Sequence, residues 1–82
     1  MKIAVDISFY PLNEEFVTPI KDFISRIKEY EKVEIFTNSM STQIRGEYHE
    51  VINALTVEMY DSFNSVPKSV FAIKILNNPL SD

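Results

Sequence analysis

The sequence predicts an α+β domain in the order β-α-β-β-α-β, with a four-stranded antiparallel sheet and two helices on one face. Three observations lead to this prediction. Apolar and polar residues alternate near both ends of the chain, which is typical of strands. Two longer segments repeat apolar residues at spacings of three and four, as helices do. The 82 residues leave room for one core, so we expect a single domain over residues 1–82.

The first strand is expected over residues 2–10, where apolar odd-numbered positions alternate with mostly polar even-numbered ones. Pro11 has no N–H to donate to a neighbouring strand, and we expect the strand to end there. The buried face consists of Ile3, Val5, Ile7 and Phe9. The opposite face would then carry Ala4, Asp6, Ser8 and Tyr10.

The first helix is expected over about residues 18–30. Thr18 is a suitable cap, and Pro19 would occupy the first helical position, where its missing N–H has no consequence. Asp22 and Arg26 have the i,i+4 spacing of a helical ion pair. The apolar stripe of this helix consists of Ile20, Phe23, Ile24, Ile27 and Tyr30.

A hairpin is expected next, with strands over residues 33–38 and Met40 to Arg45. Asn38 and Ser39 form a plausible tight turn, since Asn tolerates left-handed backbone angles. Gly46 would end the third strand. The second helix follows from Glu47 to Phe63, with an apolar stripe of Tyr48, Val51, Ile52, Leu55, Met59 and Phe63.

The fourth strand is expected from Val70 to Leu76, after a loop that contains Pro67. Residues 77–82 have the composition of a turn, and we expect a frayed tail there. This order of elements is the split βαβ arrangement of ferredoxin-like domains. Right-handed crossovers place both helices on the same face of such a sheet. The first and third strands would be central, with the second and fourth at the edges.

The sheet face away from the helices is expected to be less polar than a sheet face that is exposed to solvent. It would carry Phe36 and Tyr10 beside a few hydrogen-bonding groups. Exposed apolar surface with a polar rim is typical of binding surfaces. We therefore expect a ligand or a second copy of the chain to cover this face. Scattered surface apolar residues, which are ordinary, remain the alternative.

Composition argues against several function classes. The formal net charge is −4, from twelve acids and eight scattered bases, which is unfavourable for nucleic acid. The chain has no cysteine, a single glycine and one histidine, so thiolate chemistry, a Gly-rich phosphate loop and a His-based metal site are not expected. The N-terminal segment lacks a signal-peptide pattern, and no apolar run is long enough to cross a bilayer. We expect a cytoplasmic protein without a membrane partner.

No catalytic set emerges from the sequence, and we expect no enzymatic activity, no metal and no cofactor. His49 falls in the first turn of the second helix, where a solvated side chain is the ordinary outcome. Asp6 could pair with Arg45 or Lys74 across the open face, or it could meet a cationic ligand. Met40 and Met59 are expected in the core or at an interface.

Two stretches carry a more specific signal: Ser8 to Leu12 (SFYPL) and Met40 to Glu47 (MSTQIRGE). Together with the VFAIKI strand around Lys74, they resemble the YkoF-like family of thiamine-binding domains, over about residues 3–77. The resemblance implies a ferredoxin-like domain that assembles through its sheets. It also implies binding of thiamine or its hydroxymethylpyrimidine half without chemistry. Some members carry two such domains, so a second copy would here come from another subunit.

The residues permit such a ligand, because an aminopyrimidine needs an apolar wall and a few fixed polar groups. The candidate binding residues are Ser8, Tyr10, Phe36, Asn38, Ser41 and Thr42. Strict alternation places Ser41 on the open face and Thr42 on the helix side. Both can line one pocket only if it opens at the sheet edge or if a bulge redirects one of them.

The function expected from the sequence is therefore non-enzymatic binding of thiamine or hydroxymethylpyrimidine by a homo-oligomer, either a dimer or a tetramer formed through the sheet. The alternative is a structural or interaction module whose open sheet face only mediates oligomerisation or docks another protein.

Overall fold

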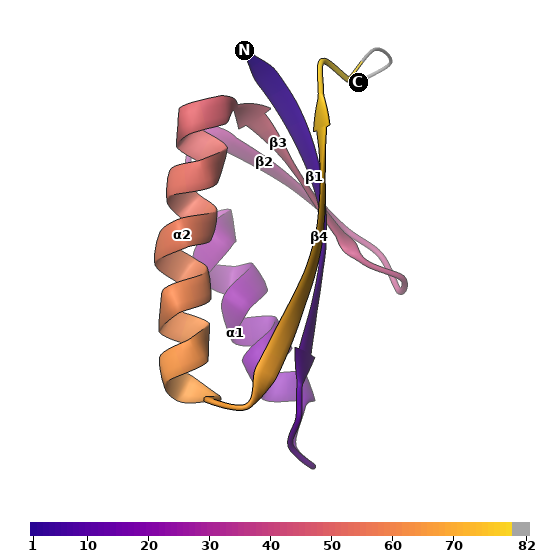
Figure 1. Cartoon of the computed structure of the whole chain (residues 1–82), viewed down its shortest axis with the longest axis vertical. Helices are drawn as coiled ribbons and strands as arrows, with labels where there is room; N and C mark the ends of the chain where they lie inside the picture. Colours follow the sequence, from indigo (N-terminus) through magenta and orange to yellow (C-terminus); the bar gives the residue numbers. More distant parts are fainter. Residues whose placement is uncertain (80–82) are drawn as a thin grey trace.

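Strands and helices follow one another in the expected order in the computed structural model, which describes residues 1–79. The elements are β1 (Lys2–Pro11), α1 (Val17–Lys28), β2 (Val33–Thr37), β3 (Thr42–Glu47), α2 (Tyr48–Ser65) and β4 (Ser69–Asn77). The strands form one antiparallel four-stranded sheet in the order β2-β3-β1-β4, and both helices lie on one side of it (Figure 1). The predicted fold class and the central position of the first and third strands are confirmed.

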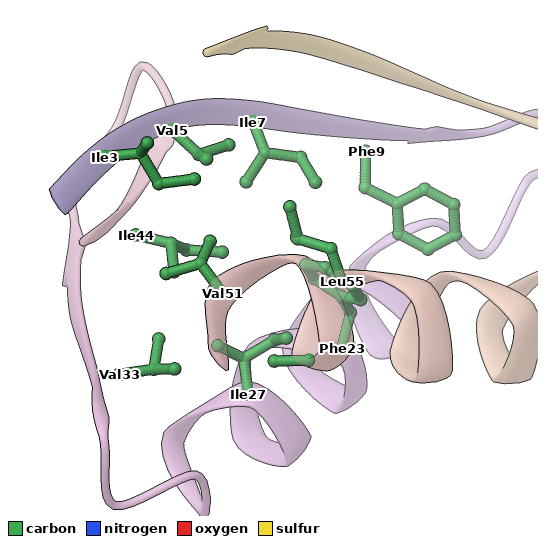
Figure 2. Packing of buried hydrophobic residues seen from close by; sticks show 11 residues of the cluster. Ile3, Val5, Ile7, Phe9, Phe23, Ile27, Val33, Ile44, Val51 and Leu55 are labelled. Carbon is green, nitrogen blue, oxygen red and sulfur yellow. The ribbon is translucent and has the colours of Figure 1, made fainter. Parts of the chain in front are cut away.

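The core lies between the helices and the middle of the sheet, and β1 is its centre. Ile3, Val5 and Ile7 are 1–2% exposed, as their alternation predicts. Figure 2 shows these side chains pointing toward the helices. The helices α1 and α2 and the strands β2 and β3 contribute the other core residues: Phe23, Ile27, Val33, Ile44, Val51, Ala54 and Leu55. Burial of these side chains is the main stabilising contribution to a domain of this size.

The first helix begins one residue earlier than expected, and Thr18 does not cap it. Phe16 occupies the cap position and makes no side-chain cap hydrogen bond. Glu15 replaces it, since its carboxylate accepts from the Thr18 N–H at 2.8 Å, and this bond lowers the pKa of Glu15. Pro19 lies within the first turn, where its missing N–H removes no helical hydrogen bond.

The hairpin between β2 and β3 is wider than the predicted tight turn. Thr37 pairs with Thr42, so residues 38–41 form the loop. The Asn38 carboxamide oxygen accepts from the N–H groups of Met40 and Ser41, at 2.8 and 3.1 Å. These hydrogen bonds fix the conformation of the loop. Because Met40 and Ser41 belong to the loop, β3 begins at Thr42, two residues later than expected.

Gly46 lies inside β3 rather than at its end, and its neighbours explain why glycine is needed. A Cβ at this position would lie 3.0 Å from the Lys32 carbonyl oxygen and 3.2 Å from Val51 Cγ2. The glycine therefore permits close packing between β3, α2 and the loop before β2. Glycine is needed here because a side chain would not fit, rather than for its backbone freedom.

An ion-pair cluster joins the two helices. Arg26 Nε lies 2.6 Å from Glu58 Oε1 and 3.2 Å from Asp61 Oδ2, so the predicted pairing of Arg26 with Asp22 is wrong. The Tyr30 hydroxyl donates to Glu58 Oε2 at 2.6 Å, and this hydrogen bond raises the pKa of Tyr30 to about 12. Glu58 is 8% exposed, and a buried carboxylate of this kind needs such partners.

The end of the chain is more ordered than the expected tail. β4 runs through Asn77, and the Asn78 N–H donates to the Lys2 carbonyl at 3.1 Å. Residues 80–82, which belong to the expected frayed tail, lie outside the described residues. Among the described residues, neither helix is both long and apolar enough to span a bilayer.

Candidate functional site

The strands of the sheet differ in length, and this difference creates an edge beside the core. β1 pairs with β3 only as far as Ile7, opposite Thr42. On its other side β1 stays paired with β4 as far as Pro11, opposite Ser69. Residues 8–11 of β1 therefore have no strand beside them where β3 would continue. Figure 1 shows the β2–β3 hairpin diverging there from β1 and β4.

A cavity of about 480 Å³ lies at this edge, within the range of about 300–1,000 Å³ typical of small-molecule pockets. It is bounded by the end of β1, the 38–41 loop and the first half of α1. The apolar part of the lining is Ile7, Phe9, Pro11, Leu12, Phe16, Ile20, Phe23, Ile24 and Met40. The polar part is Ser8, Tyr10, Thr37, Asn38, Ser39, Ser41 and Thr42. No charged side chain of the described residues lines it.

The backbone of β1 supplies further polar groups to this edge. In an antiparallel pair, hydrogen-bonded and non-hydrogen-bonded residue pairs alternate. The Leu12 N–H donates to Lys68 and the Asn78 N–H donates to Lys2, so the even-numbered residues of β1 bond to β4. The odd-numbered residues face β3, in agreement with the bond from the Tyr48 N–H to Met1. Phe9 is the first odd-numbered residue beyond the end of β3, and its N–H and C=O point toward the cavity edge.

The structure brings five of the six predicted binding residues together around the cavity: Ser8, Tyr10, Asn38, Ser41 and Thr42. Ser41 is partly exposed, whereas Thr42 is 7% exposed on the helix side. Both line the same cavity because it lies at the edge of the sheet, where the two faces meet. The Thr42 hydroxyl lies 3.3 Å from the Thr37 hydroxyl, so it already has one partner.

Asp6 holds Ser41 in place on the open side of this edge. The Ser41 hydroxyl donates to Asp6 Oδ1 at 2.6 Å. Among residues 1–79, no ion pair within 4.0 Å joins Asp6 to Arg45 or Lys74, so the predicted pairing is wrong. The Asp6 carboxylate thus lies one hydrogen bond outside the cavity, through Ser41.

Phe36, the sixth predicted residue, lies elsewhere. Its side chain is 51% exposed on the open face of β2, and it does not line the cavity. The Arg45 guanidinium lies 5.4 Å from the centre of its ring, a distance typical of a cation–π contact. Tyr10, the other aromatic candidate, does line the cavity, together with Phe16 and Phe23.

Sequence reasoning missed the contribution of α1 and of Met40. Phe16 is 53% exposed at the start of the helix and Met40 is 86% exposed in the hairpin loop. Met40 was expected in the core or at an interface, but it lies at the cavity. Ile20 and Ile24 were assigned to the core-facing stripe, and the periodicity gave no sign that part of this stripe borders a cavity.

Apart from Tyr10, no titratable side chain of residues 1–79 lines the cavity. His49 is exposed on the first turn of α2, where its N–H donates to the cap residue Glu47. Within residues 1–79, no three His, Asp or Glu side chains gather closely enough to hold a metal ion. The chemistry that the cavity offers is therefore recognition by hydroxyl, carboxamide and backbone groups in an apolar surround.

Solved structures show the same fold. A protein of Streptococcus pneumoniae superposes with a TM-score of 0.88 at 18% identity, over 98% of this chain and 90% of that one. A hypothetical protein of Methanocaldococcus jannascii superposes with a TM-score of 0.82 at 24% identity, over 99% of this chain and 84% of that one. A Thermotoga maritima protein superposes with a TM-score of 0.85 at 18% identity, over 95% of this chain and 85% of that one. That protein is described as a candidate for thiamine biosynthesis or salvage. No curated protein matches the chain.

Comparison with family models gives the identity of the domain. The model of the YKOF-related family matches residues 2–78, which is nearly the whole chain and includes every element of the sheet and both helices. This match agrees with the resemblance carried by the end of β1 and by the segment from Met40 to Glu47. The chain therefore belongs to the YKOF-related family.

Proposed function

We propose that this chain is a cytoplasmic, non-enzymatic protein that binds thiamine, or its hydroxymethylpyrimidine half, in the edge cavity. The observation that carries the proposal is the cavity itself, with an uncharged lining that combines aromatic walls with fixed hydroxyl and backbone groups. Membership of the YKOF-related family supports it. The description of the Thermotoga maritima protein of the same fold also supports it.

The polar groups suit a flat heterocycle that carries donors and acceptors on one edge. The Phe9 N–H and C=O offer one donor and one acceptor on the side of β1 that β3 leaves unpaired. Thr42 and Asn38 add groups that can act as donors or acceptors. An aminopyrimidine edge presents the complementary set, and its ring can pack against Phe16 or Phe23.

The absence of charge in the lining favours the pyrimidine half over a phosphorylated ligand. A phosphate group binds most strongly where Lys or Arg side chains replace its hydration. The lining supplies no such side chain. The thiazolium cation would lie toward the open side, where the Asp6 carboxylate accepts a hydrogen bond from Ser41. Among residues 1–79, no acid–base pair of side chains lines the cavity, and we propose binding without chemistry.

Assembly through the open face of the sheet is the second part of the proposal. This face carries four half-exposed apolar side chains from three strands: Tyr10, Phe36, Val70 and Leu76, each 48–57% exposed. Apolar surface of this kind is unusual on a monomer when it is contiguous. A second copy, as a dimer or within a tetramer, would cover it.

Binding can be tested by thermal unfolding and calorimetry with thiamine, hydroxymethylpyrimidine and thiamine phosphate. A ligand at 100 times its dissociation constant adds about 2.7 kcal/mol, which for a domain of this size corresponds to an increase in Tm of about 10 °C or more. We expect the first two ligands to stabilise the protein and thiamine phosphate to do so less. No shift with any of them at millimolar concentration would contradict the proposal.

The exposed open face also favours a second candidate function, an interaction module that binds only protein. In that case Phe36→Lys would disrupt assembly, while none of the three small molecules would change the Tm of either variant. If the ligands stabilise both the wild type and the Phe36→Lys variant, the binding function is supported independently of assembly.

A further inference from the structure

The 38–41 loop borders the cavity with polar groups that already bond within the protein. Asn38 and Ser41 both line the cavity, and their backbones are joined, because the Asn38 N–H donates to the Ser41 carbonyl oxygen at 3.1 Å. A polar group that has its partners can offer a ligand only its remaining donors or acceptors. The bonds inside the loop therefore decide what each of these residues can do for a ligand.

The Asn38 side chain is left with donors only. Its carboxamide oxygen accepts from the Met40 N–H at 2.8 Å and from the Ser41 N–H at 3.1 Å. These two bonds use both lone pairs of the oxygen. They also identify which end of the carboxamide is the oxygen, because an NH2 group could not accept from two N–H donors. The group that Asn38 can offer to a ligand is therefore its NH2.

The Ser41 side chain is left with an acceptor only. A serine hydroxyl has one proton and two lone pairs. The proton is donated to Asp6 Oδ1 at 2.6 Å, a length typical of a strong bond to a charged acceptor. The Ser41 N–H and C=O are both bonded to Asn38. What Ser41 can offer to a ligand is therefore a lone pair of its hydroxyl oxygen.

Asp6 determines the direction of the Ser41 hydroxyl, although Asp6 does not line the cavity itself. A carboxylate can only accept hydrogen bonds, so Ser41 has to be the donor of this pair. Asp6 lies in the middle of β1, where it is paired with Gln43 of β3, and the regular sheet fixes its position. An apolar residue at position 6 would allow the Ser41 hydroxyl to turn its proton toward a ligand.

We propose that the cavity selects amino heterocycles over their oxo counterparts, with Asn38 as donor, Ser41 as acceptor and Asp6 as the positioning residue that holds the Ser41 proton. The matching ligand edge carries an acceptor nitrogen beside an amino group, as an aminopyrimidine does. Thr42 and the Phe9 backbone each offer a donor and an acceptor, so the selection depends on the loop. This inference rests on the proposed function and specifies the ligand class of the same site.

The oxo counterpart of an aminopyrimidine presents the reverse pattern. A carbonyl oxygen replaces the amino group, and the adjacent ring nitrogen carries a hydrogen. The Asn38 NH2 would then face a ring N–H, and the Ser41 oxygen would face a carbonyl oxygen. Neither contact is a hydrogen bond, and polar groups that lose water without gaining a partner weaken binding. The two ligands have nearly the same shape, so an apolar wall distinguishes them poorly.

Calorimetric titration with hydroxymethylpyrimidine and with its oxo counterpart measures this selection directly. The wild type should bind the amino ligand about tenfold more tightly, since the difference is one or two partly exposed hydrogen bonds. Neither probe carries a thiazolium ring, so attraction between that cation and Asp6 does not enter the comparison.

Asp6→Ala releases the Ser41 proton without changing the cavity lining. The variant should bind the oxo ligand more tightly than the wild type does, and the preference should fall from about tenfold to about twofold. A merely structural role of Asp6 would weaken both ligands equally and leave their ratio unchanged. Asp22→Ala, on the exposed side of α1 and outside the lining, is the matched control and should leave both affinities unchanged.

Asp6→Asn provides the same test if Asp6→Ala does not fold, because it keeps the shape of the side chain. Its NH2 group can donate to the Ser41 oxygen, which frees the Ser41 proton, so the preference for the amino ligand should again decrease.

Asn38→Asp reverses the other partner. The new carboxylate can still accept from the N–H groups of Met40 and Ser41, which keeps the loop in place. It then offers an acceptor where Asn38 offers a donor. Affinity for the amino ligand should fall about tenfold, and the preference should shift to the oxo ligand, whose ring N–H can donate to the carboxylate.

Two outcomes would overturn this inference and leave the proposed binding function intact. One is equal affinity of the wild type for the two ligands. The other is an unchanged affinity ratio in a folded Asp6 variant or in Asn38→Asp. Failure of the wild type to bind either ligand is a different result, since it would overturn the proposed function and the inference with it.

Discussion

Ile7 on β1 and Ile73 on β4 are register partners on the same side of the same sheet, yet they differ sharply in burial. Ile7 is 2% exposed and Ile73 is 37% exposed. The next pair along the strands repeats the contrast, with Val5 at 1% and Ile75 at 54%. The two strands have similar alternating sequences, so the difference arises from what lies above them.

The helices provide that difference. Both helices contact β1, while α2 also contacts β3 and α1 contacts β2. β4 meets the helical layer chiefly through Phe71, whose ring touches those of Phe23 and Phe63. A periodic pattern therefore tells which side of a strand is apolar, but the placement of helices decides whether that side is covered.

The largest expected effect comes from truncating the two isoleucines in turn. Ile7→Ala should lower the free energy of unfolding by about 3 kcal/mol, because it leaves a void in a packed core. Ile73→Ala should lower it by less than about 1 kcal/mol when measured at low protein concentration. Urea unfolding gives both values. Equal losses would show that β4 is covered as well as β1.

The close packing of the covered strands can be tested next at Gly46. Gly46→Ala should destabilise the fold by about 2 kcal/mol, because the new methyl group would press on the Lys32 carbonyl and on Val51. The companion substitution Ala72→Ser, on exposed β4, should change stability by less than about 0.5 kcal/mol. A neutral Gly46→Ala result in the same urea experiment would contradict the packing argument.

Glu58 links the two helices through Arg26, and it also accepts a hydrogen bond from the Tyr30 hydroxyl. The titration of Tyr30 therefore tests this contact. The pKa of Tyr30 in the folded protein is raised to about 12, above the value of about 10 for an unfolded tyrosine. Its contribution to stability is therefore complete below pH 10 and is lost as the pH rises from 10 to 12.

Tyr30→Phe should lower the free energy of unfolding at pH 7 by about 1 kcal/mol, since the hydrogen bond is only partly buried. It should also remove most of the pH dependence of stability between pH 10 and 12. Denaturant unfolding across that range is the measurement. An unchanged pH profile in the variant would show that Tyr30 is not the group responsible.

The smallest expected effect lies at the end of β1, where β3 no longer pairs with it. Thr42→Val keeps the shape of the side chain and removes one hydroxyl from the cavity, and should weaken thiamine binding about fivefold. Adding Ser41→Ala should weaken it further. Phe36→Leu, outside the cavity, should leave the affinity unchanged. Equal affinities in all variants would show that the ligand binds elsewhere.

Much of the fold followed from the sequence because alternation and helical stripes report directly on buried faces. The burial of odd-numbered residues on β1 is confirmed, as is the order of elements. The predicted ends of strands were less accurate where contacts with residues distant in the sequence determine them. The sequence predicts that Gly46 ends a strand, but Gly46 lies inside β3 and permits the close approach of Val51 and Lys32.

The polar lining of the candidate site could be expected from the sequence, but its shape could not. Ser8, Asn38 and Thr42 were identified from residue type and family resemblance. Their position around one cavity depends on β3 ending opposite Ile7 while β4 continues to Pro11. Strand register and relative length are properties of the pairing, so they cannot be read from one segment at a time.

By itself, the sequence determined the secondary-structure order, the apolar side of each element and the uncharged, hydroxyl-bearing character of the segments that flank the cavity. These properties depend on neighbours a few residues away along the chain. The tertiary structure alone decided which apolar side stays uncovered and where a cavity opens. Both depend on how far each strand extends beside its partner and on which strands the helices cover, so they arise only when distant segments pack together.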